Sequence, residues 1–343
     1  MPDEHGRVIE GTLSPTGAVP LISLLLTALC LQVGSDGPSI PEPILKITEE
    51  TMQADVDHLA DDAYYGRYWL SPFGRKAAVW IRDQMIAAGI EPGLPDGKWF
   101  QELTQKDAAP NVVGIVRGRN PEAGYVILGA HYDHLPPRRR GEDKIYNGAD
   151  DNASGTAAVL AVGRSMVALK DELESSVILI AFTGEEAGLK GSQHFVDRSP
   201  IDLKTVRGLF NMDMISRGER NTICVEGAKG APGLFKALKK ANQAIGLTLQ
   251  VDEHPDWLSR SDQWPFIRKG VPALLFSVED HEDYHQVTDH ADKIMADLAR
   301  NVARLIAITT LDLAGEEGVP SSTAETPSAG NTSEPSPPKE GTP

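Results

Sequence analysis

The stretch "YVILGAHYD" at residues 125–133 places a continuous run of apolar and small residues directly before His131 and Asp133. A run that is apolar on both faces predicts a strand buried inside a largely parallel sheet. Similar strand-length runs occupy residues 111–118, 176–183, 208–215 and 272–278. Helical patterns occupy residues 74–90, 156–170, 187–198, 232–245 and 292–313. This alternation predicts an α/β three-layer sandwich around a central mixed, largely parallel sheet.

Metal-binding side chains follow the predicted central strands. Open α/β sheets bind ligands beyond the carboxyl ends of their strands. The side chains at those ends are His131, Asp133, Glu185, Glu186, Asp213 and the loop "EDHEDYHQVTDH" at residues 279–290. Taken singly, each has a structural explanation, such as Glu185 and Glu186 capping a helix. Together, so many acids on one rim would repel each other unless a cation offset them, and the His/Asp/Glu mixture suits zinc.

Two adjacent aspartates, Asp150 and Asp151, stand in "GADDNASG" at residues 148–155, which contains no Lys or Arg. Alone, this stretch is best explained as the cap of the helix that follows. When the acidic residues at the strand ends are also considered, Asp150 and Asp151 become candidate ligands of the same cation.

Composition limits the classes of partner. The chain has 343 residues and a net charge of −16, and its basic residues are scattered apart from Arg138–Arg140. Nucleic-acid binding needs a concentrated basic face, so nucleic acid is excluded as the main partner. Of the two cysteines, Cys30 lies in the N-terminal apolar run, so cleavage of that run would leave Cys224 without a disulfide partner.

The N-terminal run "LISLLLTALCLQV" (residues 21–33) has the length of a signal-peptide core and is too short to span a bilayer comfortably. The residues before it are acidic rather than basic, which an incorrectly assigned start or an N-terminal helix packed on the domain would explain. We expect an exported protein, periplasmic or secreted, with a cytoplasmic one as the alternative. The predicted organisation is a signal segment and linker at 1–43, a folded domain at 44–314 and a disordered Pro/Ser/Thr/Glu-rich tail at 315–343.

Separated motifs occur in a fixed order between His131 and Asp289: "HYDH", "IYNGADDNASG", "FTGEEAGLKGSQHF", "NMDM" and "YHQVTD". In this order and spacing they resemble the di-zinc aminopeptidases of metallopeptidase family 28, which include bacterial leucyl aminopeptidases. The resemblance implies a phosphorylase/hydrolase-like fold, two Zn²⁺ per chain and the N-termini of peptides or small proteins as substrates. No integral membrane span is expected, because the apolar run at residues 21–33 is too short.

The family pattern also implies a set of ligands. It makes Asp150 the bridging carboxylate, with one oxygen for each zinc. Glu186 and His285 would complete one metal, and His131 and Asp213 would complete the other.

The same pattern makes Glu185 the general base, which takes the proton of the attacking water and passes it to the leaving amine. Tyr284 matches a position where some members carry a tyrosine that stabilises the oxyanion. Asp133 is expected to hold the second imidazole nitrogen of the histidine ligand. A cis peptide is expected after the bridging aspartate, between Asp150 and Asp151, with Asp151 turning the backbone so that its neighbour faces both ions.

Some residues depart from the pattern or stand beside it. Gln263, in "RSDQWPF", replaces a histidine of the family. Loop or supporting roles are expected for His134, His281 and His290. A pocket for an apolar side chain, or ordinary packing, is expected for Trp257, Trp264 and Phe266.

Several rival functions share parts of this pattern. A glutaminyl cyclase needs one zinc and would not require both His131 and Asp213. A glutamate-carboxypeptidase-like enzyme keeps both zincs but binds a substrate carboxylate with basic residues. A receptor-like relative would have lost ligands or Glu185. A two-metal phosphoesterase can use similar ligands, but the motifs weigh against it.

Overall fold

The computed structural model describes residues 39–315. The predicted signal segment, most of the predicted linker and nearly all of the predicted tail lie outside these residues. At the two boundaries, helix α1 (Glu42–Leu45) already begins within the predicted linker, and helix α8 (Ala296–Gly315) extends to the first residue of the predicted tail.

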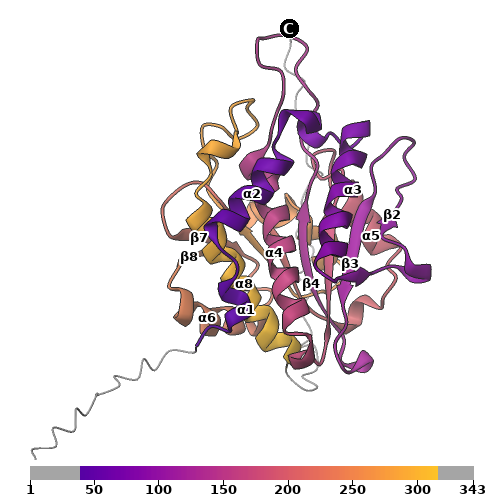
Figure 1. The fold of residues 1–343 in the computed structure, drawn as a ribbon. Coiled ribbons are helices and arrows are strands. Elements are labelled where there is room, and N and C mark those ends of the chain that lie inside the picture. The colour runs from indigo at the N-terminus through magenta and orange to yellow at the C-terminus, as the bar shows by residue number, and fades with distance from the viewer. Residues whose placement is uncertain (1–38, 316–343) are drawn as a thin grey trace, which may run out of the picture. The chain divides into compact units, whose positions relative to one another are not determined.

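A nine-stranded mixed sheet forms the centre of the fold (Figure 1). The strands are β1 (Glu91–Pro92), β2 (Phe100–Gln101), β3 (Asn111–Val116), β4 (Tyr125–His131), β5 (Ser176–Phe182), β6 (Val206–Met212), β7 (Thr222–Glu226), β8 (Thr248–Val251) and β9 (Ala273–Ser277). Their order is β1-β3-β5-β4-β6-β9-β7-β8, with β2 paired to β3. The central strands β5, β4, β6 and β9 are mutually parallel, whereas β3 and β7 join them antiparallel. The predicted mixed, largely parallel sheet is therefore confirmed.

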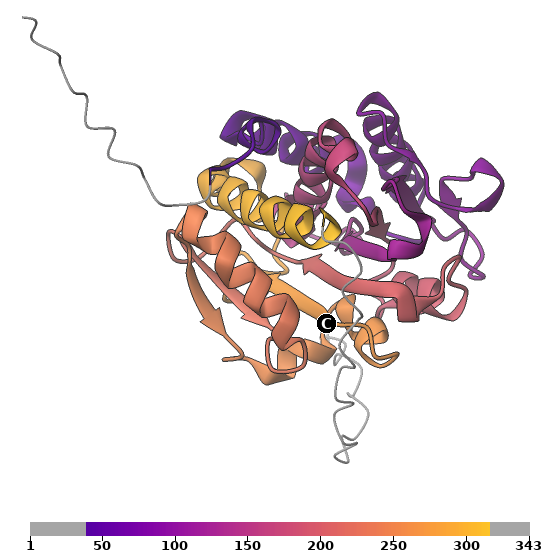
Figure 2. The same cartoon turned by 90° about the horizontal axis from the view of Figure 1, so that it is seen from below.

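Helices cover both faces of this sheet. The remaining helices are α2 (Glu49–Leu59), α3 (Pro72–Ala87), α4 (Gly155–Ala168), α5 (Lys190–Asp197), α6 (Pro232–Ile245) and α7 (Gln263–Ile267). One core joins the sheet to α2, α3, α4, α6 and α8, and a second joins its other face to α5 and α7. Figure 2 shows the yellow α8 and the indigo N-terminal helices on the same side of the sheet. These layers confirm the predicted three-layer sandwich.

Short helical turns complete the described chain. They are η1 (Asp62–Arg67), η2 (Pro95–Gly97), η3 (Pro121–Ala123), η4 (Ala149–Ser154), η5 (Lys170–Glu172), η6 (Leu203–Thr205), η7 (Pro255–Ser259) and η8 (Ala291–Lys293). Within residues 39–315, no helix is both long enough and apolar enough to cross a membrane.

Element ends differ from the sequence-based expectations at the functional rim. Strand β6 stops at Met212, so Asp213 lies just beyond the sheet rather than within it. Helix α5 begins at Lys190 instead of residue 187, because Gly188 and Leu189 both have positive φ and form a turn. The rim is therefore made of loops and strand ends, where polar side chains can turn towards one another.

Candidate metal centre

Three neighbouring parallel strands deliver acidic and imidazole groups to one cavity. His131 is the last residue of β4, Glu185 and Glu186 follow β5, and Asp213 follows β6. All four side chains line a cavity of about 1080 Å³, together with Asp151 and His285. The expected convergence of these residues at the carboxyl ends of the strands is thus present in the structure.

The first group of candidate ligands consists of His131, Asp151 and Asp213. The Nε2 atom of His131 lies 3.1 Å from Oδ1 of Asp213 and 3.4 Å from Oδ1 of Asp151. One ligand atom from each of the three residues falls within 4.8 Å of the other two. An imidazole and two carboxylates at this separation form a donor set that suits zinc.

The second group consists of Asp151, Glu186, His285 and His134. The Nε2 atom of His285 lies 3.2 Å from Oδ2 of Asp151 and 3.3 Å from Oε2 of Glu186. The Nδ1 atom of His134 lies 2.6 Å from Oε1 of Glu186 and 3.7 Å from Oδ2 of Asp151. His134 was expected in a loop or supporting role, and its buried ring contacts Glu186 directly.

Asp151 is the residue shared by the two groups. Its Oδ1 faces His131, while its Oδ2 faces His285 and His134. A carboxylate that presents one oxygen to each group has the arrangement expected of a bridging ligand.

Asp150, which was expected to bridge, has other partners. Its Oδ1 accepts hydrogen bonds from the backbone N–H of Ser216 at 2.7 Å and from the Ser216 hydroxyl at 2.6 Å. Its Oδ2 lies 3.1 Å from Nε2 of His281. The expectation for Asp150 is therefore corrected, because both of its oxygens are engaged away from the two groups. The cis peptide is likewise one residue later than expected, between Asp151 and Asn152.

Buried polar groups hold the Asp151 loop in place. The carboxylate of Asp289 accepts hydrogen bonds from the backbone N–H groups of Asp150 and Asp151 at 3.0 and 3.1 Å. Asn152 donates to the carbonyl oxygen of Met212 at 2.8 Å and accepts from the backbone N–H of Gly155 at 2.9 Å. The loop is thereby tied both to the end of β6 and to the start of α4.

Gly148, just before this loop, can only be glycine without a shift in the structure. Its φ is +57°, a conformation that side-chain-bearing residues rarely adopt. A Cβ atom at this position would lie 2.2 Å from the carbonyl oxygen of Asp151 and 2.6 Å from the ring of His134. The glycine thus permits Asp151 and His134 to approach the same stretch of backbone.

The pKa values in the centre reflect opposed charges. Burial alone would lower the pKa of His131, but the carboxylates of Asp213 and Glu185 raise it well above its usual range. Burial would raise the pKa of Glu186, but His134 and His285 hold it well below its usual range. Burial raises the pKa of Glu185, and the Asp213 and Glu186 carboxylates add to the rise, although His131 opposes it. These groups thus form a tightly coupled set in which carboxylates crowd one another.

The supporting role expected for Asp133 takes a different form. The main-chain oxygen of Asp133 lies 3.1 Å from Nδ1 of His131, whereas its carboxylate Oδ1 lies 3.9 Å away. That Oδ1 accepts the backbone N–H of Glu185 at 3.1 Å, while Oδ2 is buried without a hydrogen-bond partner. Burial raises the pKa of the Asp133 carboxyl to about 7. Asp133 therefore orients His131 through its carbonyl and positions Glu185 through its carboxyl group.

Aromatic residues line part of the cavity. The Tyr284 ring stacks on His285 with centroids 4.0 Å apart and lines the cavity, as do Trp257 and Trp264. Phe266, by contrast, is fully buried in the core with Phe182 and Phe195. The expectation of a pocket thus fits the two tryptophans, and the alternative of packing fits Phe266.

Gln263 is buried and connects two segments by hydrogen bonds. Its Oε1 accepts a hydrogen bond from Asn211 at 2.9 Å, and its Nε2 donates to the carbonyl oxygen of Leu258 at 3.0 Å. Gln263 thus links β6 to the loop that carries Trp257. His281 supports Asp150, as described above. The Nε2 atom of His290 lies 3.6 Å from Oδ2 of Asp143, and the His290 side chain is partly exposed.

Comparison with known proteins assigns this chain to a family. The family model for peptidase family M28 matches residues 111–310. That is more than half of the chain, and the match spans β3 to α8. The chain belongs to peptidase family M28. The expected family is therefore confirmed.

Relatives of this M28 chain include peptidases from fungi and bacteria. A probable leucine aminopeptidase 1 of Trichophyton verrucosum is 30% identical over 176 residues, which cover 50% of this chain and 46% of that protein. The aminopeptidase YwaD of Bacillus subtilis is 28% identical over 224 residues, which cover 61% of this chain and 46% of that protein. The chain thus spans about half the length of these curated relatives.

A solved structure supports the same fold. The zinc aminopeptidase BSAP of Bacillus subtilis matches with a TM-score of 0.65 over 84% of this chain and 99% of that chain, at 16% sequence identity. At this identity the likeness shows the fold alone.

Proposed function

We propose that this M28 chain is a zinc-dependent exopeptidase that removes N-terminal residues from peptides, with two Zn²⁺ held in the cavity. The observation that carries the proposal is the position of Asp151, whose two carboxylate oxygens face two separate groups of candidate ligands. The names of the relatives, leucine aminopeptidase and aminopeptidase, support the choice of substrate class.

The residues present fit a pair of zinc ions. His131, Asp151 and Asp213 would hold one ion, and Asp151, Glu186 and His285 would hold the other. His134 is a further imidazole beside the second ion. The carboxylates crowd one another in the cavity, and divalent cations would offset that repulsion. Bound there, two such ions polarise a scissile carbonyl and lower the pKa of a water molecule.

Glu185 is the proposed general base. It lines the cavity beside both groups but belongs to neither, and its backbone is held by Asp133. Positive charge in the cavity would counter the raised pKa of Glu185 and keep its carboxylate ionised. Glu185 then takes a proton from the attacking water and delivers it to the leaving amine.

Tyr284 and the apolar residues Trp257, Trp264 and Ile267 in the cavity lining are proposed to position the substrate. Burial raises the pKa of the Tyr284 hydroxyl above its usual range, and the Asp151 and Glu186 carboxylates add to this. The hydroxyl therefore stays protonated and can donate a hydrogen bond to the oxyanion. Trp257, Trp264 and Ile267 offer an apolar wall that suits a large apolar N-terminal side chain.

The decisive experiment compares three kinds of substrate, each with and without added zinc: aminoacyl anilides with a free amine, N-blocked peptides, and peptides ending in glutamate. We expect zinc-dependent cleavage of the free-amine substrates and loss of that activity after chelation. Cleavage confined to glutamate-terminated peptides would instead identify a carboxypeptidase. A further substrate, a peptide with a free N-terminal glutamine, would identify a glutaminyl cyclase if it were cyclised without hydrolysis.

A further inference from the structure

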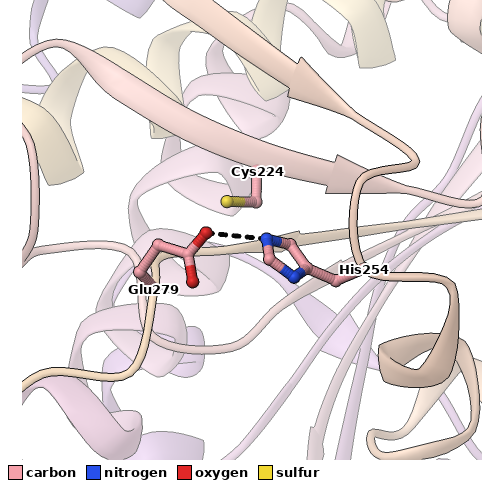
Figure 3. Close-up of side chains that lie close together, drawn as sticks. All are labelled: Cys224, His254 and Glu279. Carbon is pink, nitrogen blue, oxygen red and sulfur yellow. Dashed lines mark hydrogen bonds and ion pairs between the residues drawn. The ribbon is translucent and has the colours of Figure 1, made fainter.

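A second cluster of candidate metal-binding side chains lies next to Trp257. Cys224 is on β7, His254 follows β8 and Glu279 follows β9, and Figure 3 shows the three side chains converging. Their ligand atoms all lie within 4.8 Å of one another, and Nε2 of His254 is 2.7 Å from Oε1 of Glu279. None of the three lines the cavity of the candidate metal centre.

We propose that Cys224, His254 and Glu279 form a separate binding site for a zinc-like divalent cation. A thiolate, an imidazole and a carboxylate are the three kinds of side chain that bind zinc in proteins, and the thiolate selects against calcium and magnesium. Zinc–ligand bonds of about 2.0–2.3 Å place ligand atoms roughly 3.3–3.8 Å apart, so side-chain rotations suffice to close the cluster around an ion.

The surroundings of Cys224 favour a cation over an ordinary packed thiol. The thiol is 2% exposed and donates to Oε1 of Gln250 at 3.2 Å. The carboxylates of Glu279, Glu226 and Glu253 are near enough to act on the thiol electrostatically and to disfavour a second negative charge there. The same negative charges that disfavour a free thiolate would stabilise a cation beside it, so binding should release a proton.

Glu226 provides an independent indication of a missing positive partner. It stands two residues from Cys224 on β7, so both side chains lie on the same face of the strand. Its Oε1 accepts the backbone N–H groups of Glu253 and His254 at 3.1 and 3.0 Å. The residue is only 1% exposed, and its Oε2 is buried without a hydrogen-bond partner. A buried carboxylate oxygen left without a partner is costly unless a cation lies nearby.

The site adjoins the proposed substrate wall. The ring of His254 stacks on Trp257 with centroids 4.0 Å apart and an interplanar angle of 14°. Trp257 packs with Cys224 and Leu275 and also lines the cavity. A cation that fixes His254 would therefore also fix the tryptophan at the cavity edge.

Cobalt titration of the full chain tests the proposal directly. Co²⁺ bound to a thiolate absorbs in the near ultraviolet by charge transfer from sulfur, whereas the candidate ligands in the cavity contain no sulfur. The experiment uses Cys30→Ser protein kept reduced, so that Cys224 is the remaining cysteine of the two in the sequence. The band therefore reports on this cluster whether or not the cavity binds metal.

We expect the band in the Cys30→Ser protein and its absence after the additional change Cys224→Ser. His254→Gln keeps the thiol and should weaken cobalt binding by at least about tenfold, since even supporting residues around a metal contribute that much. His290→Gln alters another histidine beside a carboxylate and should leave the band unchanged. Absence of the band at saturating cobalt, or a band that His254→Gln leaves unaltered, would overturn the proposal.

Discussion

At the scale of single residues, the proposed mechanism requires some carboxylates to bind cations and another to transfer a proton. Glu185 and Glu186 are neighbours in the chain but have different surroundings. Glu186 contacts His134 and His285, whereas Glu185 contributes to neither group of candidate ligands. The adjacent pair thus separates into a proposed ligand and a proposed base.

Replacing the proposed base should remove turnover without removing metal. Glu185→Gln keeps the size of the side chain but cannot accept the proton, so we expect kcat to fall by about 10²–10⁴-fold. Zinc content measured on the same sample should equal that of the unaltered protein. Loss of zinc together with activity would show that Glu185 is a ligand instead.

The aspartate pair shows where sequence-based prediction stopped. The motifs located the loop that carries the candidate bridging ligand, but Asp150 and Asp151 are adjacent and chemically identical. Which of the two faces the cavity depends on distant contacts. Ser216 and His281 contact the Asp150 carboxylate, and Asp289 accepts the backbone N–H of Asp151 and so fixes the path of the loop. Those contacts come from segments more than 60 residues away in the chain, so the local pattern could not reveal them.

His134 was underestimated for a similar reason. It lies three residues beyond the end of β4, where a loop can direct a side chain anywhere. In the structure the His134 ring contacts Glu186, and it packs against Gly148, where a side chain would collide with the ring. Its position in "HYDH", three residues after His131 at the end of the strand, was the one signal in the sequence that could have indicated a role.

At the scale of elements, Arg67 joins the segments that surround the centre. It is fully buried, and its guanidinium donates to the carbonyl oxygens of Leu59, Tyr132, Asn147 and Gly148 at 2.6–2.9 Å. Burial lowers its pKa to about 10, and the carboxylates of Asp151 and Asp289 oppose this. The end of α2, the loop after β4 and the start of the Asp151 loop thus share one donor group.

Removal of this donor should destabilise the domain strongly. Arg67→Met leaves several buried carbonyl oxygens without a partner, at about 1–3 kcal/mol each before water enters. We expect the free energy of unfolding in urea to fall by about 3 kcal/mol or more. Arg75→Met, which breaks the exposed pair with Glu102, should cost about 1 kcal/mol or less. Equal losses for the two variants would refute the structural role of Arg67.

The elements themselves were predictable to different degrees. The central strands β3, β4, β5, β6 and β9 have long apolar runs because both faces of each are buried. The edge strands β1 and β2 contain two residues each, and β8 is half-exposed, so none shows a comparable pattern. Periodicity therefore revealed five strands in the middle of the sheet. It missed the edge strands and also β7, which is buried in the interior of the sheet.

At the scale of the whole molecule, the elements that form the centre all lie between η1 and α8. The candidate ligands come from the last residue of β4 and from the loops after β4, β5, β6 and β9, and the sheet brings these together. Residues outside the described part of the chain contribute none of the candidate ligands named above. Catalysis is therefore expected to be a property of the folded domain.

Deletion of residues 316–343 tests this expectation. We expect kcat/KM on a free-amine aminoacyl anilide to change by less than about threefold, since α8 remains intact and terminal segments usually tolerate truncation. Circular dichroism would verify that the shortened domain is folded. A folded but inactive truncated protein would show that the tail takes part in catalysis.

The most direct test of the central claim is the zinc content per chain of Asp151→Asn compared with Asp150→Asn. Both variants are made in the Cys224→Ser background, so that the cavity alone is counted, and zinc is measured by mass spectrometry after gel filtration. If Asp151 joins two ions, its replacement should reduce the content from two zincs to one or none, while Asp150→Asn should retain more metal. Full zinc content in Asp151→Asn, with loss in Asp150→Asn, would contradict the assignment.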